Sequence, residues 1–338
     1  MRNNNEVMSV VGEYSKEFPH NAEISIGLIE RGNITYYGFK KGEELRVTDN
    51  KDSVFGIGSI TKVLTANILS DGVVKGEIEL DKKLESYYDF NFKHNIDDTL
   101  LNLANHSSGF KGRGDDFEAN INSLRDYYAS FEEDELLSYL ENLTLYDSSV
   151  LGRYSYSNYG YGLLGITLSK IYGKSVDNLI KEHVFDKYNM SNSYTTATEA
   201  SAVLVQGLDA EGHAAAPWDL KALKSAGGVF STVVDMTKYV QAHLCNSDLS
   251  LSFMRTPTLK VDQQMDIGLG IHVIKENDNT IYWHNGGGGG YKSAMEFDVD
   301  NQCGVIVLSN VSFFHPSHWD IDRICTKLMS ELLDSGRR

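Results

Sequence analysis

Segments with the pattern of β-strands lie at the two ends of the chain, and the stretch between them is rich in helical patterns. Near the N-terminus, apolar residues cluster in 24–29 and 34–39 on either side of turn residues, which is typical of a β-hairpin. Further strands are predicted in the last third of the chain, at 268–274, 280–284, 293–299 and 304–308. The simplest packing joins both groups in one antiparallel sheet.

Helices are predicted to flank this sheet. Apolar residues at helical spacing occur near both termini and before the middle of the chain, at 7–18, 59–74 and 321–333. We therefore expect an α/β fold of the α+β type, with an antiparallel sheet from both chain ends and an inserted all-helical lobe. The sheet domain would comprise residues 1–80 and 235–338, and the lobe residues 81–234. The site would lie between them, in one compact catalytic unit.

The charge of the chain excludes several classes of partner. Its 31 basic and 47 acidic residues give a formal net charge of −16. Such a surface repels phosphate backbones and anionic lipids, so we expect neither nucleic-acid nor membrane binding. No apolar run reaches the 18 residues of a transmembrane helix. Residues 1–6 do not resemble a secretory signal, which predicts a cytoplasmic protein, or a secreted or periplasmic one whose leader was removed.

Several motifs suggest cofactors or metals but lack the required surroundings. The glycines of 160–165 have the spacing of a dinucleotide-binding fingerprint, but no strand precedes them. We therefore interpret them as small residues that allow close packing of a helix. The five glycines of 286–290 precede Tyr291, Lys292 and Ser293 and resemble a phosphate loop. That motif requires glycine directly before the lysine, however, and Tyr291 occupies this position. His315 and His318 lack a third ligand and indicate the start of a helix. Three separated cysteines argue against disulfides and zinc. We expect no cofactor and no metal, and the oligomeric state stays open.

Two Ser-x-x-Lys sequences could supply a nucleophile, because residues i and i+3 are neighbours on a helix. Ser59 precedes Lys62 at the start of an apolar helix, where the helix dipole and a free N–H favour an oxyanion. Ser108 precedes Lys111 in a glycine-rich turn, where the two side chains need not face each other. We therefore take Ser59 as the candidate nucleophile, with Lys62 to activate it.

A second candidate element is Tyr156-Ser157-Asn158. In an extended loop, residues i and i+2 point to the same side, so the phenol and the amide would enter one cleft. A phenolate near an ammonium is a competent general base, and an amide can hold a substrate carbonyl. The alternative is that Asn158 caps the helix that follows.

The third element is the segment from His284 to Gly287, between two predicted edge strands. Glycines there let the backbone approach a ligand and direct an N–H group into a cleft. A lone histidine in this position has a structural role more often than a functional one.

Together these elements resemble the serine β-lactamase and penicillin-binding protein superfamily, in particular its class C β-lactamase-related branch with D-stereospecific peptidases and esterases. The resemblance covers residues 22–330. It is carried by the segments Ser59–Lys62, Leu103–Gly109, Tyr154–Tyr161, Ala226–Thr232 and His284–Tyr291.

The resemblance implies roles for individual residues. Ser59 would be acylated, while Lys62 and Tyr156 would share the proton transfers. The N–H groups of Ser59 and Gly287 would form the oxyanion hole, in which each donor contributes about 10²–10³ in rate.

Substrate contacts are implied in the same way. Asn158 would hold the substrate amide, and Gly286 would border the bound substrate. His284 would replace the Lys of the Lys-Thr-Gly triplet of class C β-lactamases. Because a histidine is close to neutral at pH 7, it binds a substrate carboxylate more weakly than lysine does.

We therefore predict a serine hydrolase that forms an acyl-enzyme with a small-molecule or short-peptide substrate. An ester or a D-amino-acid amide or peptide is favoured over a β-lactam. The alternatives are a β-lactamase proper, and a penicillin-binding sensor or trap that deacylates slowly. An acyltransferase would use the same groups.

Overall fold

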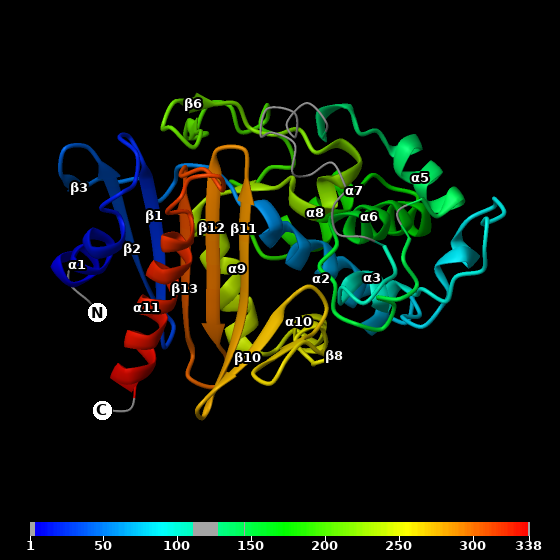
Figure 1. Ribbon diagram of the computed structural model, residues 1–338. Coiled ribbons are helices and arrows are strands. Elements are labelled where there is room, and N and C mark those ends of the chain that lie inside the picture. Colours follow the sequence, from blue (N-terminus) through cyan, green and yellow to red (C-terminus); the bar gives the residue numbers. More distant parts are fainter. Residues whose placement is uncertain (1–3, 111–127, 145, 337–338) are drawn as a thin grey trace.

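The computed structural model describes residues 4–110, 128–144 and 146–336. Its main feature is a nine-stranded antiparallel sheet with the order β3-β2-β1-β13-β12-β11-β10-β9-β8 (Figure 1). The strands are β1 (Glu23–Glu30), β2 (Asn33–Lys41), β3 (Leu45–Val47), β8 (Leu259–Lys260), β9 (Met265–Ile267), β10 (His272–Glu276), β11 (Asn279–Gly288), β12 (Tyr291–Asp298) and β13 (Cys303–Ser309). The predicted sheet built from both chain ends is therefore confirmed.

The join between the two chain ends lies at β1 and β13. These strands pair antiparallel from Ile24 opposite Ser309 to Glu30 opposite Cys303. On its other side β1 forms the predicted hairpin with β2. The six residues inside the ends of β1 are all buried, as expected for a strand covered on both faces.

Helices cover both faces of the sheet. α1 (Asn4–Tyr14) and α11 (Trp319–Gly336) pack together, and α11 contacts β12 and β13 (Figure 1). α9 (Val233–Cys245) contacts β1 and β13 from the opposite side. Successive residues of β13 alternate between two apolar cores: Val305 and Val307 join the α11 side, whereas Ile306 and Leu308 join the other.

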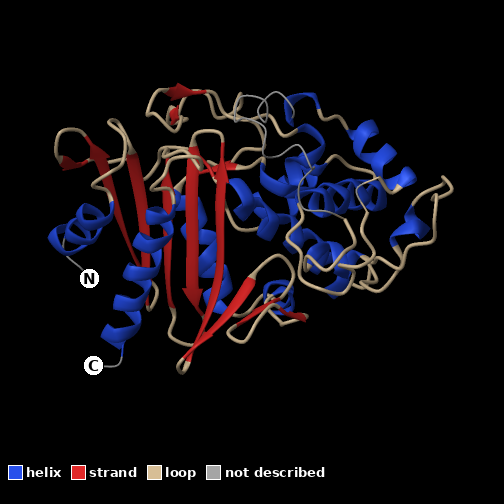
Figure 2. Ribbon diagram, viewed as in Figure 1, coloured by secondary structure: helices blue, strands red, loops and turns tan. Residues whose placement is uncertain are grey.

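The second part of the molecule is mainly helical, as Figure 2 shows. Its helices are α2 (Thr61–Val74), α3 (Leu100–Ala104), α5 (Glu133–Asn142), α6 (Asn158–Tyr172), α7 (Val176–Ile180), α8 (Lys224–Gly227) and α10 (Leu249–Met254). A π-helical turn (Lys181–Phe185) follows α7, and 3₁₀ turns occur at Leu84–Tyr87 and Lys221–Leu223. α2 lies among α6, α8 and α10, and every residue from Thr61 to Gly72 is buried. The sequence pattern had indicated burial of one side of this helix.

The glycines of 160–165 lie in α6 and permit close packing, as predicted. A Cβ at Gly162 would meet Leu136 and Leu223, and one at Gly165 would overlap Ser225 of α8. These glycines therefore let α6 approach its neighbours more closely than larger residues would allow.

Short strands depart from the predicted all-helical middle. β4 (Phe55–Gly56) pairs with β7 (Phe230–Ser231), and β5 (Gly207–Leu208) pairs with β6 (Ala214–Ala215). The β4–β7 pair joins the segment before Ser59 to a segment of the middle region. The division of the chain at residues 80 and 234 stays a prediction. Within the described ranges, no helix has both the length and the apolar character needed to cross a membrane.

Candidate active site

Ser59 lies in a 3₁₀ turn, Gly58–Ile60, and α2 begins only at Thr61. The sequence had placed Ser59 at the start of the α-helix itself. Gly58 has a positive φ of 49°. A Cβ at this position would lie 2.5 Å from the Gly287 nitrogen, so glycine is needed for this backbone to approach β11. The turn therefore holds Ser59 beside Gly287.

Lys62 lies one helical turn from Ser59, as the spacing predicts. Its Nζ donates to Ser59 Oγ at 3.0 Å and to the carbonyl oxygen of Ala226 at 2.6 Å. The Lys62 side chain is completely buried. Two oxygen acceptors thus hold the ammonium beside Ser59 Oγ.

Tyr156 contacts the other side of Lys62, whose Nζ lies 4.9 Å from the centre of the phenol ring. Ser157 is extended, with φ −133° and ψ 116°, so Tyr156 and Asn158 both reach the same cleft, as predicted. Ser157 itself caps α6, because its Oγ accepts from Gly160 N at 2.9 Å. The alternative that Asn158 is the cap is therefore wrong, and Asn158 is the first residue of α6.

His106 is a site residue that the sequence analysis did not single out, although it lies in the turn of 103–109. Its ring centre is 4.4 Å from that of Tyr156 and 5.0 Å from that of Tyr161. Its Nδ1 accepts from the Ser157 N–H at 3.1 Å. Burial, together with the charge of Lys62, holds the pKa of His106 well below its usual range. A neutral His106 thus anchors the loop that carries Tyr156.

His284, Gly286 and Gly287 belong to β11 itself. The sequence predicts a strand that ends at His284, with the glycines after it, but β11 pairs with β12 as far as Gly288 opposite Tyr291. Its pairing with β10 ends earlier, at Trp283, so the last part of β11 borders the cleft. The glycine-rich sequence weakened the strand pattern, and pairing with β12 overrides this weak local preference.

The histidines beside the cleft are neutral at pH 7. His284 Nδ1 donates to the carbonyl oxygen of Asn285 at 2.6 Å. Burial is the main reason why the pKa of His284 lies well below its usual range, and His272 and Lys62 lower it further. Burial also lowers the pKa of His272 to about 4, and this ring is hydrogen-bonded to Tyr154 Oη at 2.8 Å.

The cleft over Ser59 has two connected parts. Both are lined by Ser59, Tyr128, Asn158, Trp218 and Gly287. The part that we call the inner pocket is also lined by Gly56, Gly58, Leu220, Leu223, Ala226, Gly227, Phe230, Gly288, Gly289 and Tyr291. The part that we call the outer pocket is also lined by Tyr154, Tyr156, Met265, His272, Trp283, His284, Asn285, Phe313, Phe314, His318 and Trp319.

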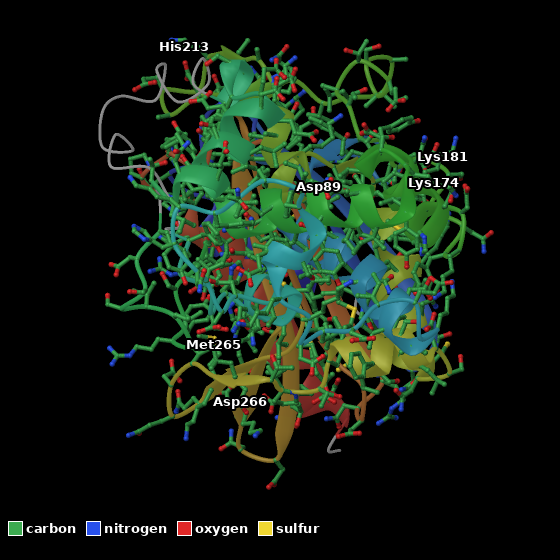
Figure 3. All side chains as sticks on the ribbon, turned by 90° about the vertical axis from the view of Figure 1, so that its right-hand side faces the viewer. Asp89, Lys174, Lys181, His213, Met265 and Asp266 are labelled. Carbon is green, nitrogen blue, oxygen red and sulfur yellow. The ribbon has the colours of Figure 1, made fainter. Side chains whose placement is uncertain are left out.

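The competing sequence candidates lie elsewhere. Ser108 is fully buried beside the first turn of α6, and Lys111 lies outside the described residues. His318 differs from the other candidates because it lines the outer pocket, and its Nδ1 hydrogen-bonds to the His315 carbonyl in the turn before α11. The described residues include one cluster with metal-ligand chemistry, at Asp209, Glu211 and His213. Figure 3 shows His213 far from Met265 of the outer pocket.

Comparison with known proteins identifies the family. Residues 16–323 match the Beta-lactamase family, to which the chain therefore belongs. It is a family of serine hydrolases, and the resemblance inferred from the motifs is thereby confirmed.

Curated relatives and a solved structure support the assignment. The chain is 24% identical over 310 residues to the putative penicillin-binding protein PbpX of Bacillus subtilis, covering 89% of this chain and 73% of that protein. It is 26% identical over 281 residues to the D-alanyl-D-alanine-carboxypeptidase/endopeptidase AmpH of Escherichia coli K12, covering 76% and 71%. The octameric penicillin-binding protein homologue from Pyrococcus abyssi has the same fold, with a TM-score of 0.81, 24% identity and coverage of 98% and 78%.

Proposed function

We propose that the protein is a serine hydrolase that forms an acyl-enzyme on Ser59. The observation that carries this proposal is the position of Lys62 Nζ, 3.0 Å from Ser59 Oγ and 4.9 Å from the ring centre of Tyr156. An ammonium held beside a hydroxyl and over a phenol ring stabilises negative charge that develops on either oxygen during the reaction. In a serine hydrolase of this family, a serine, a lysine and a tyrosine in this arrangement would transfer the acyl group of a substrate to the serine.

We propose the following reaction for these residues. Ser59 Oγ attacks the substrate carbonyl carbon while its proton passes to Tyr156, with Lys62 stabilising the negative charge. The oxyanion accepts hydrogen bonds from the N–H groups of Ser59 and Gly287, and Asn158 holds a substrate amide. Tyr156 then returns the proton to the leaving group as the carbon–leaving-group bond breaks. Water, activated by Tyr156, finally attacks the ester and releases the acid from Ser59.

The substrate is proposed to be a small ester or a D-amino-acid amide or peptide. One relative is named as a D-alanyl-D-alanine-carboxypeptidase/endopeptidase, which supports D-peptides, and another as a putative penicillin-binding protein, which supports β-lactams. Neutral His284 in the position of a lysine weakens the hold on a carboxylate and favours esters. A penicillin-binding trap is the second candidate, since acylation needs the same residues whether deacylation is fast or slow.

Intact-protein mass spectrometry tests both candidates. Wild-type protein would be mixed with p-nitrophenyl acetate or with benzylpenicillin, and p-nitrophenol or free penicillin would be followed in the same tube. We expect an adduct on Ser59 that is absent in Ser59→Ala and retained in Ser108→Ala, with continued release of p-nitrophenol. A stoichiometric burst without turnover would support the trap. Turnover that survives Ser59→Ala would refute the proposed nucleophile.

A further inference from the structure

The side of the cleft that receives the leaving group follows from the position of the proton donor. Tyr156 lines the outer pocket and is absent from the described lining of the inner pocket. A leaving group must take its proton from Tyr156 within hydrogen-bond reach, so its departing atom lies on the outer side. The acyl group then occupies the inner pocket, beside the oxyanion donors. This argument rests on the proposed function.

The outer pocket has an aromatic wall built from distant segments of the chain. Trp283 comes from β11, Phe313 and Phe314 come from the segment before α11, and Trp319 opens that helix. The ring centres of Phe314 and Trp218 are 5.7 Å apart, and Trp218 lines both pockets. The aromatic wall therefore continues to the border with the inner pocket. Such a surface binds flat, apolar groups by burial of aromatic area.

Charge is the second property of this pocket. Among its described lining residues there is no lysine or arginine. His272 and His284 face it in neutral form, because burial lowers the pKa of each ring. A leaving group with a carboxylate would lose part of its hydration here without gaining a cationic partner.

A lysine of β12 lies close to the outer pocket, because the Nζ of Lys292 is 5.2 Å from the ring centre of Trp319. Lys292 lies directly opposite Gly287 in the β11–β12 register. Its side chain is fully buried, and Nζ forms an ion pair with Asp322 Oδ2 at 2.7 Å. Asp322 Oδ1 accepts from Asn285 Nδ2, also at 2.7 Å, so this carboxylate links β11 and β12 to α11. Asp322 therefore compensates the charge of Lys292, which leaves this ammonium less available to a substrate carboxylate.

We propose that the outer pocket selects substrates whose leaving group is uncharged and aromatic or apolar, and that it rejects leaving groups that carry a carboxylate. Aryl esters and aryl amides belong to the first class. Penicillins and peptides with a free C-terminus belong to the second, because their carboxylate lies on the leaving amine. The pocket thus makes the protein an esterase or amidase for neutral substrates.

Two acetate esters of the same shape test this selection. 3-Carbamoylphenyl acetate and 3-carboxyphenyl acetate differ in the charge of one substituent, and their alkaline hydrolysis rates correct for intrinsic reactivity. We expect the corrected kcat/KM of the wild-type protein to be about 10²-fold lower for the carboxylate, as expected for a charge left without a partner. Equal values, or a preference for the carboxylate, would overturn the proposal.

A cation added to the outer pocket should weaken the preference for the uncharged ester. Trp319→Arg places a guanidinium at the mouth, where the side chain is 52% exposed, and His284→Lys places an ammonium deeper in the pocket. Each substitution should reduce the difference in corrected kcat/KM between the two esters, which we call the gap, to about 10-fold or less. His20→Lys adds the same charge at an exposed position outside the described pocket lining and should leave the gap unchanged.

The outcomes separate this inference from the proposed function. If neither ester acylates Ser59, the inference fails, and the proposed function fails with it unless benzylpenicillin forms the adduct. If both acylate Ser59 and the gap is absent, the proposed function stands and the selection by charge is wrong. If folded Trp319→Arg leaves the gap as wide as His20→Lys does, the outer pocket does not hold the leaving group.

Discussion

Substitution of Gly58 by alanine tests whether catalysis depends on the close approach of the Ser59 turn to β11. An added Cβ would lie 2.5 Å from Gly287 N, whereas ordinary contact begins at 3.4 Å, so the two backbones must separate by 0.9 Å. The N–H groups of Ser59 and Gly287 would then no longer converge on one oxyanion. Because a misplacement of about 1 Å can cost about 10²-fold in rate, we expect kcat/KM for p-nitrophenyl acetate to fall at least that far.

The controls separate this displacement from backbone strain. Gly76 also has a positive φ, 74°, and a Cβ there would meet nothing within 4 Å. Gly76→Ala therefore introduces similar strain, about 1 kcal/mol, without moving the site. Gly32 has a positive φ of 82° and again no contact within 4 Å, so Gly32→Ala is a second control of the same kind. If folded Gly58→Ala, checked by circular dichroism, has activity within threefold of Gly76→Ala, the reasoning is refuted.

Four further substitutions give distinct results. Tyr156→Phe should slow Ser59 acylation by about 10²–10⁴-fold with an unchanged melting curve, and retained activity would exclude the phenol as base. Ser157→Ala should lower the free energy of unfolding by about 1 kcal/mol through loss of the helix cap. Asn158→Ala should instead mainly raise KM for amide substrates, and the reverse pattern would contradict these roles. Burial raises the pKa of Glu296 to about 7, above its usual 4.5. The unfolded state therefore loses its proton first, and this residue's contribution to stability falls by up to about 3 kcal/mol as pH rises from 4.5 to 7. Urea unfolding at pH 5 and pH 8 should show Glu296→Gln gaining on the wild type at pH 8, and a constant difference would refute the assignment.

Local patterns were sufficient to predict the sheet and the position of most motifs. The β1–β2 hairpin and the four C-terminal strands have continuous or alternating apolar residues, and tertiary packing agrees with that preference. By contrast, β8 and β9 contain only two and three residues, too few for any period to be visible. They form at the sheet edge because β10 supplies a partner for β9.

The lining of the site was harder to predict than its nucleophile. The Ser59–Lys62 pair is local, so one helical turn was enough to bring its atoms together. Trp218, Phe313 and His272 reach the cleft from three separate parts of the chain, and no short-range pattern connects them. His106 stood in a recognised turn, but its role depends on contacts with the loop of 154–157, which long-range packing determines.

The charge state of the site illustrates how residue type and environment combine. By composition the cleft holds several groups that could be cationic near pH 7, yet burial favours the neutral form of His106, His272 and His284. Lys62 is buried too, but two oxygen acceptors compensate its ammonium. The charge of Lys62 lowers the pKa of His106 and His284 further, which adds to the effect of burial in keeping both rings neutral. Burial thus keeps the histidines of the outer pocket neutral while Lys62 stays beside Ser59, which supports both the proposed acylation of Ser59 and the proposed rejection of carboxylates.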